Sequence, residues 1–342
     1  MPDEPITQPP AALLPLEPMD PRLTTIQPGS GVVCHLEMAW GRWRRFWLRT
    51  FRPGYVRRMA ALRRGTFNGC PHPVLDPRDL KYFQNQGGYH WEPQDDPFRW
   101  RDRLPFARVG LAELLVFSVL TFGPAAGLAA GLLAAGDAVG LAVQLSGWLL
   151  TAAFAVCGLL IVWFFRDPPR RIPEGPGLVV SPADGKVVAV DELHDEFIGG
   201  PAVRIGIFLS IFSVHLNRAP VAGRVIGLRY QPGKYLNALR PESARENEQL
   251  AVRLQETTAP YRRFIVRQIT GAIARRIVCL LKPGDEIGRG ERFGMIKLGS
   301  RTELVLPRES GLVIRVRIGD KVLAGATLMA EYAELPDRGA DD

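Results

Sequence analysis

The longest apolar stretch of the chain lies at residues 111–165, where the only formal charges are Glu113 and Asp137. Asp137 and the glycine before it divide the stretch into two segments, 114–136 and 138–165. Each segment reaches the roughly 20 residues that a helix needs to cross the hydrocarbon of a bilayer. The pattern therefore predicts two transmembrane helices joined by a short turn. A buried helical hairpin in a soluble protein is the alternative, but such helices usually carry a polar stripe.

Downstream of residue 165 the pattern changes to short runs of alternating Val, Ile, Leu and Arg, separated by Gly, Pro and Asp turns. Such runs occur at 178–193, 202–230 and 262–288. Alternation with a period of two between turn residues predicts strands, and seven or more of them predict a β-rich domain. The one helical candidate in this region lies around 241–254. We expect a mainly β (α+β) domain at residues 167–342, preceded by the two-helix transmembrane hairpin at 109–166.

Residues 1–108 form an N-terminal extension. The first thirty are rich in Pro and have no cationic region ahead of an apolar run, so they predict a disordered tail rather than a secretory signal. From Trp40 to Arg64, nine arginines alternate with six aromatic residues. Three interpretations of this basic aromatic segment stay open: a helix at the headgroups of an anionic membrane, a nucleic-acid-binding segment, or a basic helix packed on its own domain.

The charge and the cysteine content indicate which partner and which compartment the chain suits. The net charge of +8 and the pI near 9.6 suit an anionic partner, and the two apolar segments favour a membrane over nucleic acid. Arginines flank both ends of the apolar stretch, which predicts that both ends lie in the cytoplasm. They are Arg99, Arg101, Arg103, Arg108, Arg166, Arg170 and Arg171. The four cysteines are scattered without a C-x-x-C zinc or redox signature, and we expect no disulfide framework. Two Cys-His neighbourhoods, at Cys34 and Cys70, match no common metal site.

Three segments of the β-rich domain depart from the composition of ordinary strands and turns. They are 181–187 (SPADGKV), 208–220 (FLSIFSVHLNRAP) and 293–304 (FGMIKLGSRTEL). Taken singly, each has an ordinary interpretation: an Asp-Gly turn, a buried core histidine, and a small Gly-Ser interruption of a strand. In this order and spacing they resemble the phosphatidylserine decarboxylase family, whose self-cleaving element is a Leu-Gly-Ser sequence. The resemblance runs from Arg166 to the end and includes 232–238 (PGKYLNA) and 246–248 (ENE).

The resemblance implies that the chain cuts itself between Gly299 and Ser300. The serine hydroxyl would attack the Gly299 carbonyl, and elimination from the resulting ester would leave a pyruvoyl group made from Ser300. Glycine suits this bond because it accepts strained backbone geometry and puts no side chain in the path of attack. A large chain (1–299) and a small chain (300–342) would stay together, and assembly of several copies is left open.

A serine needs a base, and the resemblance assigns this role to His215 with Asp184 in support. Some members of the family have a second histidine three places after the first, where this chain has Arg218. His215 is therefore expected to serve self-cleavage, proton donation during decarboxylation, or both. The pyruvoyl ketone would form a Schiff base with the amine of phosphatidylserine and accept the electrons released with CO2, giving phosphatidylethanolamine. An archaetidylserine would present the same headgroup, and no metal is expected.

Two other classes of protein compete with this interpretation. A non-enzymatic membrane adaptor with a biotinyl-lipoyl-like domain would explain the hammerhead-like β elements in SPADGKVV and VRIGDKVLAGATLMAEY. Its lipoyl form needs a lysine at an exposed hairpin tip, but the sequence has no such lysine between well-matched strands, and the adaptor gives the Leu-Gly-Ser element and His215 no role. A serine hydrolase would use Asp184, His215 and Ser300, but the Gly-x-Ser-x-Gly elbow is absent from the sequence. We expect an enzyme of the cytoplasmic (cell inner) membrane, with its catalytic domain facing the cytoplasm, a lipid substrate and no nucleic-acid partner.

Overall fold

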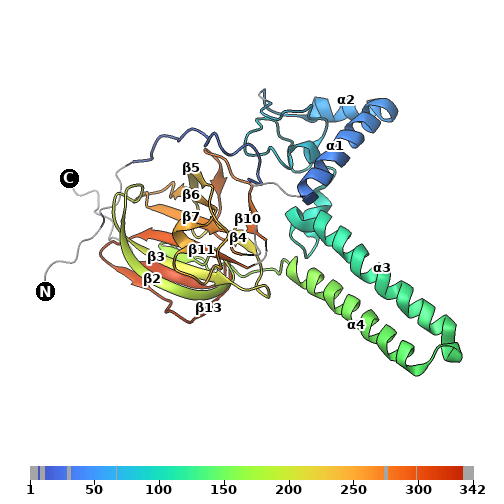
Figure 1. Ribbon diagram of the computed structural model, residues 1–342. Coiled ribbons are helices and arrows are strands. Elements are labelled where there is room, and N and C mark those ends of the chain that lie inside the picture. Colours follow the sequence, from blue (N-terminus) through green and yellow to red (C-terminus); the bar gives the residue numbers. More distant parts are fainter. Residues whose placement is uncertain are drawn as a thin grey trace, which may run out of the picture. The chain divides into compact units, whose positions relative to one another are not determined.

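Two compact units make up the protein, one from residues 1–99 with 170–342 and the other from residues 100–169. Figure 1 labels their helices and strands. The first unit contains the strands, and the second contains the two longest helices among the described residues. The computed structural model describes residues 7, 12–28, 32–66, 68–272, 276–297 and 299–333.

The second unit is built on two apolar helices, α3 (Leu111–Ala135) and α4 (Leu141–Phe164). Both are long and apolar enough to cross a membrane, with mean hydropathies of 1.8 and 2.2 in their most apolar windows. The prediction of two apolar helices is therefore confirmed. The 3-10 helix η3 (Arg108–Gly110) directly precedes α3, and η4 (Gly136–Ala138) follows it. A further 3-10 helix, η2 (Arg99–Arg103), lies earlier in the chain.

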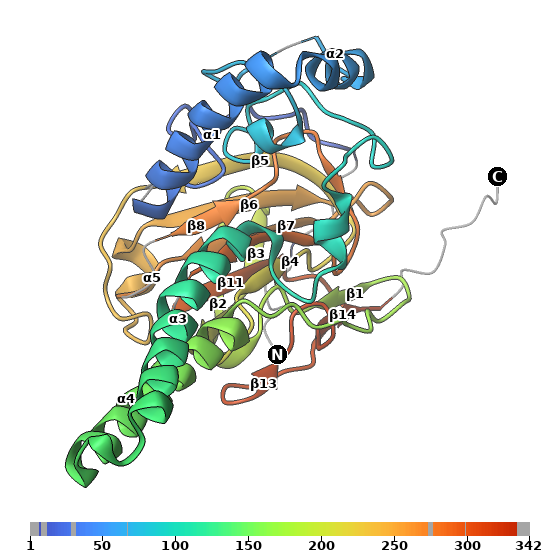
Figure 2. The ribbon, with the colours of Figure 1, turned by 90° about the vertical axis from the view of Figure 1, so that its right-hand side faces the viewer.

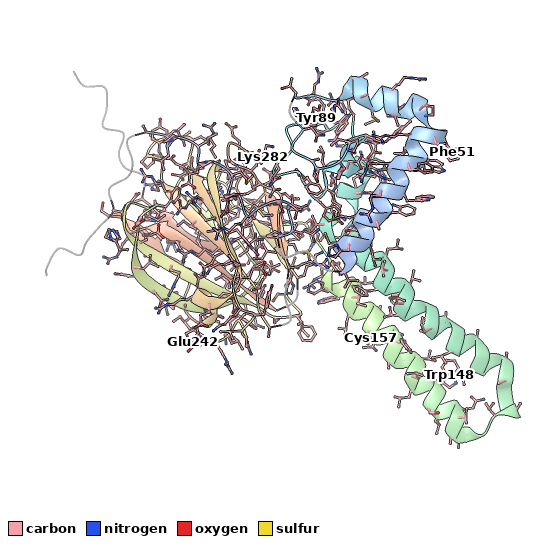
Figure 3. All side chains as sticks on the ribbon, turned by 45° about the horizontal axis from the view of Figure 1, so that its top comes forward. Phe51, Tyr89, Trp148, Cys157, Glu242 and Lys282 are labelled. Carbon is pink, nitrogen blue, oxygen red and sulfur yellow. The ribbon has the colours of Figure 1, made fainter. Side chains whose placement is uncertain are left out.

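Two glycines of α4 let the helices approach each other closely. A Cβ atom on Gly147 would overlap the Leu132 side chain, and one on Gly158 would overlap the ring of Phe122. Because the later glycine faces the earlier residue of α3, the helices run antiparallel. Trp148 and Cys157, both on α4 and labelled in Figure 3, have exposed side chains.

The strands of the first unit occupy residues 178 to 332. They are β1 (Leu178–Val180), β2 (Gly185–Asp195), β3 (Gly200–Leu209), β4 (Leu216–Arg218), β5 (Gly223–Gln231), β6 (Gln249–Gln255), β7 (Arg263–Ile269), β8 (Ile277–Cys279), β9 (Glu286–Ile287), β10 (Arg292–Ile296), β11 (Ser300–Pro307), β12 (Leu312–Ile314), β13 (Lys321–Val322) and β14 (Leu328–Tyr332). This β-rich region confirms the mainly β prediction.

Eight of these strands form one antiparallel sheet in the order β13-β2-β3-β11-β7-β6-β5-β9, which curls around the core (Figure 2). Two three-stranded sheets, β1-β14-β12 and β4-β10-β8, complete the domain. The second of them pairs β10 with β4, so the two segments that carry the candidate residues begin to converge. The hammerhead likeness of the elements around β1, β13 and β14 stays a prediction.

One face of the large sheet supplies the main hydrophobic core. In β3, alternate residues Val203, Ile205, Ile207 and Leu209 are each at most 5% exposed and belong to this core. Burying a side chain of this size contributes about 1.5–3 kcal/mol relative to leaving it in water. The sequence alternates with a period of two because one face of this sheet packs on the core.

The helix predicted around 241–254 is largely wrong. Only Ser243–Glu246 is helical, as the one-turn helix α5, and the chain enters strand β6 at Gln249. Leu250, Val252 and Leu254 of β6 are fully buried in the main core. Their period-two spacing and their pairing with β5 and β7 outweigh local helix propensity.

The prediction of a disordered N-terminal tail is wrong for residues 12–28. Leu14 and Ala12 hydrogen-bond the side chain of Gln255, and Glu17 forms ion pairs with Arg229 and Arg253. Further along, the side chain of Leu23 is fully buried in the main core. The segment has no hydrophobic period because it lies extended across the domain and contacts it at separate points.

Two helices follow this segment, α1 (Val32–Phe51) and α2 (Pro53–Leu62). One side of α1 packs on its own domain, because Arg44 is buried and pairs with Asp76 and Asp79 beside the 3-10 helix η1 (Pro77–Leu80). Four aromatic side chains of α1 are more than half exposed; they are Trp40, Trp43, Phe46 and Phe51, the last labelled in Figure 3.

Cys34 and Cys70 pack in a small hydrophobic cluster with Val74, Tyr82 and Phe83. Burial raises the pKa of both thiols, to about 11 for Cys70. Among the residues that the structure describes, no three His, Cys, Asp or Glu side chains gather as a metal site. The cysteines therefore act here as small core residues.

Candidate active site

Ser300 is the first residue of β11, which lies between β3 and β7 in the large sheet. Its backbone is opposite Leu209 of β3, and the following residue, Arg301, is opposite Ile269 of β7. The side chain of Ser300 is fully buried, and its Oγ atom has no hydrogen-bond partner among the described residues. Leaving a buried hydroxyl unsatisfied is costly. The fold thus leaves this oxygen free to react.

Glycine is required at two positions next to the predicted cleavage site, for different reasons. Gly299 has a φ of +59°, a left-handed conformation that glycine adopts readily, while a Cβ atom there would meet no described atom within 4 Å. At Gly271, just beyond β7, a Cβ atom would overlap the carbonyl oxygen of Gly299. Gly299 needs conformational freedom and Gly271 needs space. Leu298, the first residue of the predicted Leu-Gly-Ser element, lies outside the described residues.

His215 contacts Gly299, the residue before the predicted cleavage bond. The backbone N–H of Gly299 donates a hydrogen bond to Nε2 of His215 over 3.3 Å, and Nδ1 lies 2.8 Å from the carbonyl oxygen of Ser213. Because a carbonyl oxygen only accepts hydrogen bonds, Nδ1 carries the ring proton and Nε2 presents its lone pair to Gly299. The side chain is fully buried. The structure thus brings the predicted base and the predicted cleavage bond together.

Asp184 is held by other groups. One of its oxygens accepts a hydrogen bond from the Arg170 guanidinium, and the other accepts one from the backbone N–H of Ala324, each at 2.7 Å. The acceptor on the Nδ1 side of His215 is the Ser213 carbonyl. In this structure Asp184 therefore fastens the turn after β1 to the segment after β13, and its support of His215 stays a prediction.

Arg218 occupies the position where some members of the family have a second histidine. Its guanidinium is buried and donates to the carbonyl oxygen of Gly290 at 2.9 Å, while its backbone N–H donates to the carbonyl of Pro182. These contacts hold β4 in place after His215. A side chain fixed in this way acts in this structure as an anchor for β4.

A buried polar network that the sequence did not reveal lies behind His215 and Ser300. The Asn217 side chain donates to Thr302 Oγ1 at 3.1 Å and accepts from Gln268 Nε2 at 2.9 Å. All three side chains are fully buried. They come from β4, β11 and β7, so they lock the strand after His215 to the strand that begins at Ser300.

The segments 232–238 and 246–248, noted in the sequence, meet each other next to the cleavage site. Asn247 hydrogen-bonds both the N–H and the carbonyl of Leu236, and it also donates to the carbonyl of Thr270 at 2.8 Å. Thr270 immediately precedes Gly271. Asn247 thereby joins three separate segments into one wall beside the Gly299 carbonyl.

Glu248 continues this wall below the surface. The hydroxyl of Tyr230 donates to its carboxylate at 2.7 Å, and its backbone carbonyl accepts from both the N–H and the hydroxyl of Thr270. Burial raises the pKa of Glu248 and that of Tyr230. These bonds fix the end of β7 and thereby hold Gly271 in position.

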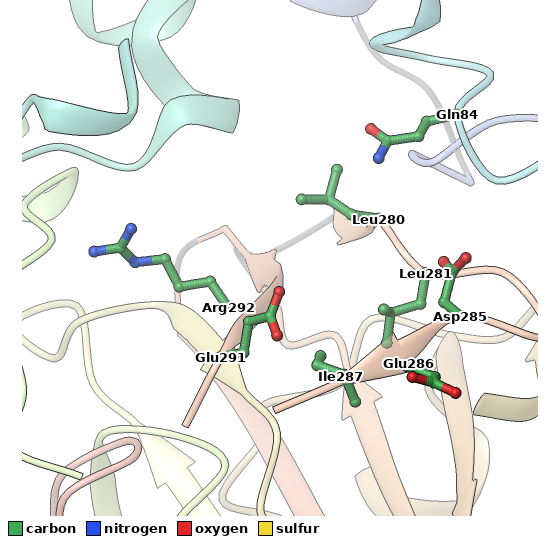
Figure 4. Close-up of a pocket in the computed structure, with 8 residues that line it drawn as sticks. All are labelled: Gln84, Leu280, Leu281, Asp285, Glu286, Ile287, Glu291 and Arg292. Carbon is green, nitrogen blue, oxygen red and sulfur yellow. The ribbon is translucent and has the colours of Figure 1, made fainter. Parts of the chain in front are cut away.

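A cavity of about 270 Å³ lies elsewhere, beside β9 and β10 (Figure 4). Two of its carboxylates cap backbone turns: Asp285 accepts from the N–H of Lys282 and Glu291 from that of Gly288, each at 2.9 Å. The lining residues are Gln84, Leu280, Leu281, Asp285, Glu286, Ile287, Glu291 and Arg292, with none of the candidate catalytic residues among them. The cavity is thus separate from the chemistry at Ser300.

The fold and the site together define a class of β-rich proteins with a buried serine and a buried histidine at one Gly-Ser sequence. The serine hydroxyl has no partner among the described residues, the glycine has a positive φ, and the imidazole lone pair faces the backbone N–H of this glycine. The family model described as phosphatidylserine decarboxylase matches residues 157–330.

Individual proteins of that name are also similar to this chain. A phosphatidylserine decarboxylase proenzyme of Rhodopirellula baltica is 49% identical over 258 residues, which cover 75% of this chain and 100% of the relative. One of Nitrosomonas eutropha is 44% identical over 195 residues, 57% of this chain and 88% of the relative. The chain belongs to the phosphatidylserine decarboxylase family and is an enzyme.

Proposed function

We propose that this enzyme converts phosphatidylserine to phosphatidylethanolamine and CO2, with a pyruvoyl group that it makes from its own Ser300. One observation carries this proposal: the Ser300 hydroxyl is buried without a described hydrogen-bond partner, and the backbone N–H of the preceding residue, Gly299, faces the Nε2 lone pair of His215. The similar proteins are named proenzymes, which fits an enzyme made as a precursor. The family gives no support to the membrane-adaptor alternative.

Self-processing would begin when Ser300 Oγ attacks the carbonyl carbon of Gly299. The new C–O bond replaces the C–N bond, the hydroxyl proton passes through a base to the departing amine, and an ester joins the two residues. Loss of the Ser300 α-proton then expels the Gly299 carboxylate and leaves dehydroalanine. Tautomerisation and addition of water release ammonia and leave the pyruvoyl group. His215 is the proposed base, because its Nε2 lone pair lies 3.3 Å from the backbone nitrogen of Gly299.

The position of Ser300 also suits the group that it would become. The pyruvoyl group supplies an electrophilic ketone that accepts the electron pair released with CO2. Asn217, Gln268 and Thr302 hold the strand that would carry it, and the surrounding burial would exclude water. His215 would return a proton to the carbon that loses CO2, with Asp184 as a supporting group.

The two chains produced by cleavage would remain joined through the sheet. β11, which would begin the small chain (300–342), pairs along its length with β3 and β7 of the large chain (1–299). The hydrogen bond from Ala324 to Asp184 adds a second connection between them. We infer a heterodimer of the two fragments, whose further assembly into a homo-oligomer is left open.

The helices α3 and α4 would anchor the enzyme as a transmembrane hairpin in the cytoplasmic membrane, with the catalytic domain in the cytoplasm. Their length and apolar composition support this, and arginines flank both ends. The exposed aromatic side chains of α1 support contact with an anionic bilayer, because indole rings and guanidinium groups suit the headgroup region. The lipid substrate would then be phosphatidylserine, or an archaetidylserine with the same headgroup.

Replacement of Ser300 by alanine tests the proposed function. Ser300→Ala should remain a single chain and should release no CO2 from phosphatidylserine in vesicles, because alanine has no oxygen to attack Gly299. Ser310→Ala is the matched control, since Ser310 is exposed and lies in the same fragment; it should be cut and active like the wild type. Full decarboxylase activity in the Ser300 variant would refute the proposal.

A further inference from the structure

Two loops of the catalytic domain expose large apolar side chains at the edge of the candidate active site. Ile211 and Phe212 are 46% and 59% exposed in the loop between β3 and β4. Tyr235 and Leu239 are 38% and 57% exposed in the segment between β5 and α5. We call these four residues the apolar rim. Exposed apolar side chains that gather at one place often mark a surface that binds a protein or a membrane.

The first loop is tied to the reaction centre at both ends. It starts after Leu209, which is opposite Ser300 in the sheet, and it ends at His215, whose ring accepts a hydrogen bond from Gly299. Within the loop the N–H of Ser213 donates to the carbonyl of Ser210 at 2.9 Å, which forms a tight turn with Ile211 and Phe212 at its tip. The loop is therefore short and held by this hydrogen bond, and the two exposed side chains lie at its tip.

The second loop also approaches Gly299, through Ala238. Ala238 is buried, and its Cβ lies 3.4 Å from where a Cβ on Gly271 would be, over the Gly299 carbonyl. Leu239 follows directly and is exposed. Asn247 fixes the loop through its two hydrogen bonds to Leu236. Each loop thus has one end beside Gly299 and an apolar side chain that is more than half exposed.

We propose that the apolar rim inserts into the lipid bilayer and guides the headgroup of the substrate from the membrane into the site. This inference rests on the proposed function. Because a diacyl lipid stays in the bilayer, the enzyme must hold its site at the membrane surface to bind the serine headgroup. Aliphatic and aromatic tips on loops with the reacting bond at their base suit the boundary between headgroups and acyl chains. A surface for a second copy of the chain is the competing occupant.

Kinetics on two substrates test the role of the rim. In phosphatidylcholine vesicles that carry the full-length enzyme, Phe212→Asp and Leu239→Asp should each lower turnover of long-chain phosphatidylserine about tenfold, as expected when one large apolar contact with the bilayer is lost. Turnover of a water-soluble, short-chain phosphatidylserine by the same samples should not change. If both substrates are affected equally, the residues act inside the site and the proposal is overturned.

Leu13 is a matched control for these variants. It is 42% exposed and lies between Ala12 and Leu14, which both bind Gln255 at the far end of β6. Gln249, at the other end of β6, is opposite Ile269 beside the site, about 20 Å away at the usual rise of a strand. Leu13→Asp should leave turnover of both substrates unchanged.

A fluorescent label gives a second readout that does not depend on activity. An environment-sensitive dye would be attached to Phe212→Cys or Leu13→Cys, in a background where the exposed Cys157 is replaced by serine. The three other cysteines are buried, and burial raises the pKa of Cys279 to about 12, so they should not react. The dye at position 212 should shift to the blue and be quenched by nitroxide lipids in the vesicles. The dye at position 13 should do neither.

Two results in this assay would overturn the proposal. One is a dye at position 212 that stays in water and escapes quenching. The other is a blue shift that depends on protein concentration and not on lipid, which would identify a contact between copies of the chain. The dye signal does not depend on turnover. An inactive protein whose dye at position 212 still enters the bilayer would therefore contradict the decarboxylase proposal and leave the rim proposal standing.

Discussion

At the scale of single residues, the site depends on two glycines that meet at one carbonyl group. Gly299 supplies a positive φ that an L-residue adopts only with strain of about 1 kcal/mol or more. Gly271 leaves room for the Gly299 carbonyl oxygen. The attack on this carbonyl requires its carbon to face the Ser300 hydroxyl, so a displacement on either side should slow cleavage.

Gly271→Ala should therefore slow self-processing at least about tenfold, because its methyl group would displace the scissile carbonyl, and a misplacement of about 1 Å can cost a hundredfold in rate. Gel electrophoresis during synthesis in vitro measures the fraction cut over time. Gly223→Ala is the control, since its methyl group would overlap a backbone oxygen of Gln255 at the far end of β6. Equal slowing of the two variants would show a general loss of stability and contradict this role.

Some residues of the site could be predicted from the sequence and others could not. The Gly-Ser bond and His215 could be predicted because the segments that carry them, in their order and spacing, resemble the phosphatidylserine decarboxylase family. Gly271 could not, because its role comes from a contact with Gly299 that exists only after β7 pairs with β11. The contact between the Ser213 carbonyl and His215 could not be predicted either, because every residue has a backbone carbonyl and the sequence does not show which one faces the ring. The support that Asp184 was predicted to give His215 stays a prediction.

At the scale of elements, the N-terminal segment behaves as part of the domain. Residues 12–28 contribute Leu23 to the main core, and the Asp20 carboxylate accepts a hydrogen bond from the backbone of Tyr230 at 2.9 Å. The strands were predictable because they alternate with a period of two. This segment was not, because an extended chain held at separate points has no period. The buried residues of β6 show the same limit, since a short apolar run fits a helix or a strand.

Leu23→Ala tests whether the segment is bound as described. Removing a fully buried leucine should lower the free energy of unfolding of the domain by about 2–4 kcal/mol. Leu13→Ala should lower it by less than about 0.5 kcal/mol, because Leu13 is largely exposed. Denaturant titration in mild detergent compares the two. Similar, small effects of both variants would mean that the segment does not pack on the domain.

At the scale of the whole molecule, cleavage would divide a sheet without separating it. Because β11 lies between β3 and β7, the new terminus at Ser300 would stay buried with the groups that surround it. The apolar helices form a compact unit of their own. Their existence was the easiest feature to predict, because 24 and 25 residues of apolar sequence permit few other structures.

The proposed topology predicts which residues face each side of the membrane. With Cys157 replaced by serine, a cysteine at Ala138, in the turn between α3 and α4, should react with an impermeant maleimide only from the outer side. A cysteine at Glu174, beyond α4, should react only from the cytoplasmic side, because the flanking arginines favour that compartment. Sealed membrane vesicles of both orientations make the comparison. The reverse pattern would place the catalytic domain outside.

The intact masses of freshly purified, active enzyme under denaturing conditions test the central claim most directly. The account predicts two chains, 1–299 and 300–342, with the smaller blocked to Edman degradation and reactive toward a carbonyl reagent such as phenylhydrazine. Active protein that consists of one uncut polypeptide, with a free amino terminus and no reactive carbonyl, would contradict it.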